Sequence, residues 1–74
     1  MQDKKIFLRV VQKGVFEGRE YWGIDEGTTT LGGIVAWDDS RHLVFSHDKE
    51  KEIGLARRIA DCLRDEGIEV ECVL

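Results

Sequence analysis

The clearest pattern of apolar and polar positions lies in residues 48–66, where the spacing predicts one amphipathic helix. At 100° per residue, the apolar side chains fall on one half of the cylinder and the charged side chains fill the other half. Ser46 or Asp48 is suited to cap the first turn. Gly67, followed by Ile68, is suited to a Schellman-type stop. The apolar positions of this helix are Ile53, Leu55, Ala56, Ile59, Ala60, Cys62 and Leu63.

The rest of the chain reads as short strands separated by polar turns. Residues 68–74 alternate between apolar side chains and glutamates, which predicts a half-buried strand. Residues 5–12 carry apolar side chains on both faces, which is typical of a central strand. Further strands are expected over residues 15–24, 31–37 and 42–45, with turns at 13–14, 25–30 and 38–41.

These elements predict one domain over residues 1–74, because a chain of this length has room for a single small core. The fold class is α+β with two layers: a mainly antiparallel sheet of four to five strands with one helix, in the order β-β-β-β-α-β. A helix of about nineteen residues spans roughly 28 Å and cannot cover both faces of the sheet. The uncovered face or an edge strand is therefore expected to be buried by a second copy or another protein.

Aromatic side chains are the candidates for that interface. Tyr21 and Trp22 are adjacent, so they must face opposite sides of a shared strand, and one of them leaves the helix-covered face. A large exposed aromatic side chain on a sheet is a common anchor for a partner. The candidate interface residues are Phe7, Tyr21, Trp22 and Trp37.

Composition and charge narrow the choice of partners. The formal net charge is −4 and the basic residues do not cluster, so a nucleic-acid partner is not expected. The chain contains no apolar run long enough for a membrane span and no signal-peptide pattern, which predicts a cytoplasmic location without membrane contact. Cys62 and Cys72 lie on apolar faces without metal-ligand spacing, so we expect buried free thiols.

Residues 23–30 read Gly-Ile-Asp-Glu-Gly-Thr-Thr-Thr. This segment resembles the first phosphate loop of the actin-like ATPase superfamily, in which a strand runs into Asp-x-Gly-Thr-Thr and then into a hairpin. The resemblance implies that Asp25 organises a magnesium ion and that Gly27, Thr28 and Thr29 cradle the phosphate of a nucleotide. A plain hairpin with a Gly- and Thr-rich turn has the same pattern.

A second constellation carries two imidazoles and three carboxylates within eleven residues. Such side chains can bind a divalent cation, but turn formation and helix capping also account for the carboxylates. Its members are Asp38, Asp39, His42, His47 and Asp48. A metal-dependent nuclease site would combine Asp38 or Asp39 with Glu50 or Glu52 near Lys49 and Lys51. It is disfavoured because such sites need a carboxylate and a lysine two residues apart on one strand, whereas these Glu and Lys residues begin a helix. The chain contains no recognisable Ser-His-Asp or Cys-His relay.

The sequence thus predicts a small non-catalytic interaction or regulatory module without a cofactor, which acts as a homodimer or as a subunit. The alternative is a module that binds a phosphate or nucleotide, with magnesium, through residues 25–30.

Overall fold

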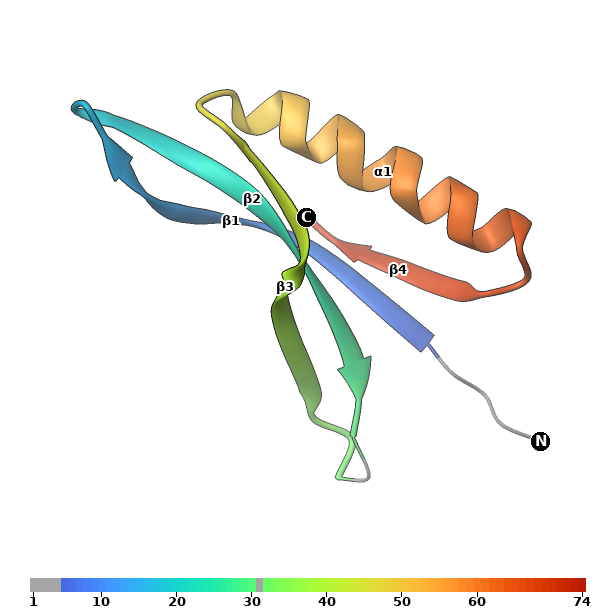
Figure 1. The fold of residues 1–74 in the computed structure, drawn as a ribbon. Helices are drawn as coiled ribbons and strands as arrows, with labels where there is room; N and C mark the ends of the chain where they lie inside the picture. The colour runs from blue at the N-terminus through green and yellow to red at the C-terminus, as the bar shows by residue number, and fades with distance from the viewer. Residues whose placement is uncertain (1–4, 31) are drawn as a thin grey trace.

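One sheet and one helix make up the part of the chain that the structure, a computed structural model, describes. This part covers residues 5–30 and 32–74, with the backbone alone for 39–44. The elements are β1 (Lys5–Phe16), β2 (Arg19–Thr29), β3 (Val35–Ser46), α1 (Lys49–Asp65) and β4 (Glu69–Val73). The four described strands are ordered β3-β2-β1-β4, and only β1 and β4 are parallel. The helix lies on one side of the sheet (Figure 1). The predicted two-layer α+β fold is confirmed.

The helix begins and ends where its capping residues predict. Asp48 is the N-cap, and its Oδ1 accepts hydrogen bonds from the Glu50 and Lys51 amides at 3.1 and 3.3 Å. At the other end, Gly67 has a φ of 85°, and the amide of Ile68 donates to the Leu63 carbonyl at 3.0 Å. This bond, with the one from the Gly67 amide to Arg64, is a Schellman stop. No helix among the described residues is long and apolar enough to cross a membrane.

The core lies between α1 and the central strands. Ala56 and Ala60 are fully buried, and their small side chains let the helix approach the sheet closely. Leu8 of β1 and Ile24 of β2 are fully buried beneath them. The remaining core residues are Ile6 and Val70. Cys62, which was expected to be buried, is exposed, because its side chain falls on the flank of the helix beyond the sheet.

The hairpin between β1 and β2 turns later than the sequence predicts. Glu17 and Gly18 both have positive φ angles, 53° and 76°, between the paired residues Phe16 and Arg19. A two-residue hairpin turn of type I′ requires positive φ angles at both central residues, and its twist matches that of the flanking strands. The turn predicted at 13–14 is wrong, since the register shifts there and β1 continues. The extra residue is accommodated as a β-bulge.

The second hairpin also differs from its prediction. Residues 25–29, expected in a loop, belong to β2, and the reversal follows at residues 30–34, where the Thr30 amide donates to the Ile34 carbonyl at 2.8 Å. The turn predicted at 38–41 lies inside β3, so the strands expected over 31–37 and 42–45 are not separated there. The register against β2 shifts between Asp38 and His42 and again between His42 and Ser46, so β3 carries extra residues there without a chain reversal.

The molecule is elongated, with principal extents of 48 × 27 × 17 Å. The closed end of the β1–β2 hairpin reaches past the first turn of α1 (Figure 1). Seventeen helical residues span about 25 Å. The helix therefore cannot cover the full length of the long hairpin, and that end of the sheet is left beyond its reach.

Candidate protein-interaction surface

The residues of the predicted phosphate loop lie in a central strand. Asp25 and Gly27 are buried and face away from α1, whereas Thr28 pairs with the core residue Ile6 and shares its face. Thr29 is exposed at the end of β2. The strand thus brings Asp25 and Gly27 to one face and directs Thr28 to the other.

Asp25 is the charged centre of the sheet face opposite α1. Its side chain is 4% exposed. Arg9 donates from Nε to Oδ2 at 3.0 Å, its Nη2 forms an ion pair with the same oxygen at 3.0 Å, and the ammonium group of Lys13 contacts Oδ1. The Arg9 guanidinium also stacks on the Trp37 ring, 4.1 Å from its centroid. A buried carboxylate needs such partners, and here two neighbouring cations provide them.

Two glycines of β2 leave the room that this layer of side chains fills. A Cβ atom at Gly27 would lie 2.6 Å from Val35 Cγ1 and 2.8 Å from Trp37 Cε3. A Cβ atom at Gly23 would meet the stem of Lys13 and the ring of Phe45, each at 3.0 Å. The side chains of neighbouring strands therefore lie flat across β2 in place of a second helix.

The end of this face near the start of β1 is closed by charged side chains. Lys5 lies over the Phe7 ring at 5.3 Å and bonds Glu71 of β4 at 2.8 Å. The hydrogen bond to Glu71 raises the pKa of Lys5. Phe7 and Trp37 are half-buried as a result. This face is not the open apolar surface that the sequence predicts, because its own charged side chains cover much of it.

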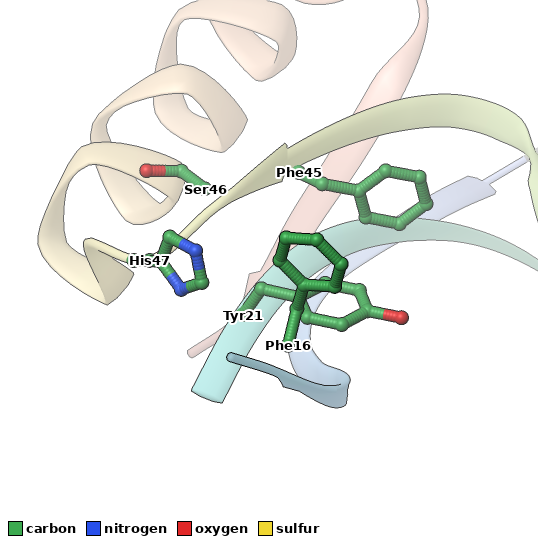
Figure 2. A pocket seen from close by; sticks show the side chains of 5 residues that line it. All are labelled: Phe16, Tyr21, Phe45, Ser46 and His47. Carbon is green, nitrogen blue, oxygen red and sulfur yellow. The ribbon is translucent and has the colours of Figure 1, made fainter. Parts of the chain in front are cut away.

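Aromatic side chains gather instead at the far end of the sheet, where Phe16 and Phe45 are exposed and Tyr21 is half-buried. We call Phe16, Tyr21 and Phe45 the aromatic cluster. The rings of Tyr21 and Phe45 meet edge to face with centroids 5.6 Å apart. Figure 2 shows the ring of Phe16 beside them, with Ser46 and His47 toward the start of the helix. These five residues line an open depression of about 330 Å³.

The cluster is exposed because it lies on the face of the sheet opposite α1, at the end away from the charged side chains near the start of β1. Phe16 is 61% exposed and Phe45 is 52% exposed. His47 supports one side: its Nδ1–H donates to the Glu20 carbonyl at 2.8 Å, which leaves Nε2 free to accept a hydrogen bond in the neutral ring. Tyr21 was a candidate from the sequence, whereas Phe16 and Phe45 were missed. The sequence contained little sign that these two residues form a site, because only the register of the sheet brings the three strands together here.

The other aromatic candidates do not belong to this cluster. Trp22 faces α1, where Lys49 lies 4.8 Å from the centre of its ring. Tyr21 thus faces the other side, as adjacent residues of a strand must. Trp37 and Phe7 are parts of the charged layer described above. Of the four predicted interface residues, the structure therefore brings only Tyr21 into the aromatic cluster.

The predicted metal constellation is only partly visible. Asp48 caps the helix and His47 bonds Glu20. The side chains of Asp39 and His42 lie outside the described residues. Within the described part, no three His, Cys, Asp or Glu side chains are grouped as metal ligands.

Glu52 is an unexpected charge in the core. Its side chain is fully buried under α1, and neither carboxylate oxygen has a hydrogen-bond partner among the described residues. Burial raises the pKa of Glu52, and the nearby Lys51 opposes that shift. Helical periodicity places Glu52 one turn before Ala56 on the same side of the helix, so the burial of Glu52 could have been predicted from the sequence.

Comparison with protein-family models, with curated proteins and with solved structures finds no match to the chain. The function must therefore be argued from the site itself.

Proposed function

We propose that the chain is a non-catalytic protein-interaction module that acts as a homodimer or as a subunit of a larger assembly. The observation that carries the proposal is the aromatic cluster, in which three rings share one open depression. Aromatic side chains anchor protein interfaces because they bury much area at little conformational cost. The ligand class is an apolar or aromatic side chain of a protein partner.

The surroundings of the cluster support this function. Val15 and Phe16 are both largely exposed at the end of β1, and Glu17 and Arg19 provide charges around the turn. An apolar centre with a polar rim is the usual layout of a protein interface.

The test uses N-acetyltryptophanamide as a stand-in for a partner side chain. At millimolar concentration we expect it to shift the amide resonances of Tyr21, Phe45 and His47. Phe16→Ser should reduce those shifts several-fold, because it removes one wall of the depression. Val15→Ser is the matched control, since Val15 is exposed to the same degree but does not line the depression. Unmoved resonances in the wild-type protein would argue against the cluster as a binding site.

The alternative function is phosphate or nucleotide binding by residues 25–30. It is favoured by the exposure of Thr29 and Thr30 at the start of the β2–β3 connection, where their hydroxyls can donate to an anion. Titration with ATP and magnesium should then shift the amides of Gly27, Thr28 and Thr29. Thr29→Val is the appropriate control variant, because substitution of Gly27 would displace Trp37. Absence of shifts at millimolar ATP would remove this alternative.

A further inference from the structure

A second apolar surface runs along one flank of the helix. Leu55, Ile59, Cys62 and Leu63, with Arg58, line a shallow depression of about 310 Å³, which we call the α1 groove. Leu55, Ile59 and Leu63 touch the core from one side and are only partly buried. The apolar stripe of the helix is therefore wider than the strip that the sheet covers.

The two flanks of the helix differ in what they contact. At 100° per residue, Arg64 lies on the flank opposite Leu55 and Cys62. Arg64 donates from Nη2 to the Val70 carbonyl of β4 at 2.9 Å. The sheet edge at β4 thus occupies one flank, and the α1 groove lies on the other.

Opposite charges stand at the two ends of the α1 groove. Helical spacing places Lys51 and Glu66 on the same flank as Leu55 and Ile59. Both charged side chains are exposed. Among the described residues, neither forms an ion pair within 4 Å. The flank therefore carries Lys51 near the start of the helix, mainly apolar side chains with Arg58 in the middle, and Glu66 just after the last turn.

We propose that a second copy of this chain packs antiparallel against the α1 groove. The midpoint between Lys51 and Glu66 is also the midpoint between Leu55 and Cys62, next to Ile59. A two-fold axis there sets Lys51 against Glu66 of the second copy, and Leu55 against Cys62 of the second copy. The inference rests on the proposed function, for which it names the surface of the homodimer.

Charge and dipoles both select the antiparallel orientation. In a parallel pair, Lys51 would face its own copy and Glu66 would do the same, so both contacts would be repulsive. The antiparallel pair also joins the positive end of one helix dipole to the negative end of the other. Arg58 lies near the two-fold axis on the exposed side, where solvent and salt screen its repulsion.

The expected dimer is weak. A strip about 25 Å long and about 10 Å wide on each helix buries less than the ~1,600 Å² of a standard interface. We expect a dissociation constant on the order of 10–100 μM, which sedimentation equilibrium from low micromolar to millimolar concentration can measure.

Disulfide trapping tests the register. Leu55→Cys, in a chain that retains Cys62, should form a covalent dimer under mild oxidation, seen on a non-reducing gel and mapped by mass spectrometry as a 55–62 bond. Within one helix these positions are about 10.5 Å apart along the axis and cannot join. Arg57→Cys, on the opposite flank, should form no covalent dimer through position 57. A Leu55→Cys variant that gives no more covalent dimer than Arg57→Cys would overturn the proposal.

A charge exchange tests the orientation. Lys51→Glu and Glu66→Lys should each weaken the dimer by about 3- to 10-fold, and the double variant should restore it to within about twofold of wild type. Each change favours the helix dipole, so neither should unfold α1. If the chain dimerises but Leu55→Cys forms no 55–62 disulfide and the double charge variant does not restore the affinity, then the α1 groove is not the dimer interface, although the chain is still a homodimer. A chain that stays monomeric at millimolar concentration would refute both, while the aromatic cluster is tested separately.

Discussion

Among the described residues, two carboxylates are buried, one on each side of the small sheet, and their surroundings are opposite. Asp25, on the face without a helix, is held between Arg9 and Lys13. Glu52, on the buried side of α1, has no hydrogen-bond partner among the described residues. Since both groups are buried, the presence or absence of partners decides what each charge costs. The open face therefore depends on a charged network that replaces a second helix, whereas the covered face carries an unpaired acid.

The largest expected effect comes from removal of both partners of Asp25. Arg9→Met with Lys13→Met keeps the apolar stems but leaves a buried carboxylate uncompensated, which should cost about 3 kcal/mol in the free energy of unfolding. Urea titration followed by circular dichroism measures the loss. A third change, Asp25→Leu, should recover most of it, because an apolar residue needs no partner. If the triple variant were no more stable than the double variant, the loss of stability could not be assigned to the uncompensated charge of Asp25.

Gly27 tests whether side chains of this face fill the place of a helix. Gly27→Ala inserts a Cβ atom 2.6 Å from Val35 Cγ1 and close to Trp37, so the indole ring must move. Overpacking of this kind costs about 1–3 kcal/mol. Thermal unfolding measures the cost, and tryptophan fluorescence reports the displaced ring. Gly54→Ala, at a position with open space around it, is the matched control and should stabilise the helix slightly.

The covered face is tested at Glu52. Glu52→Met keeps the length of the side chain and removes the unpaired charge, so we expect a gain of about 1–2 kcal/mol near neutral pH. The raised pKa also sets the sign of the pH dependence. The folded chain binds this proton more tightly than the unfolded chain does, so wild-type stability gains from Glu52 as pH falls from above the raised pKa toward 4.5. Parallel stability curves for wild type and Glu52→Met over that range would contradict this account.

The ends of the helix and the identity of the central strand could be predicted from the sequence. Asp48 and Gly67 fixed the ends of the helix, because capping depends on residues within a turn of each other. The two apolar faces of residues 5–12 identified the central strand. Local patterns of this kind, 3.6 residues per turn and alternation by two, were sufficient for the two-layer fold.

The remaining features depend on partners far apart in the chain. Asp25 looked like a loop residue because Asp and Gly suit turns, but its partners Arg9 and Lys13 lie 16 and 12 residues away. The turn at Glu17 and Gly18 was missed because the Lys13-Gly14 pair offered an equal local signal, and only the register across the hairpin decides between the two. The aromatic cluster combines side chains of three strands, which no single segment predicts.

The smallest expected effect comes from the exposed ion pair on the same face as Asp25. Lys5→Met removes the bonds to Glu71 and Glu69, but water already solvates these groups, so the melting midpoint should change by no more than about 2 °C. The pKa of Lys5 is raised by Glu71, so this contribution is complete below pH 10.5 and disappears as pH rises through the higher folded value. A Lys5→Met variant as unstable as Arg9→Met with Lys13→Met would mean that solvent exposure does not separate the Lys5 pair from the pairs of Asp25. The special importance of the Asp25 network would then need another cause.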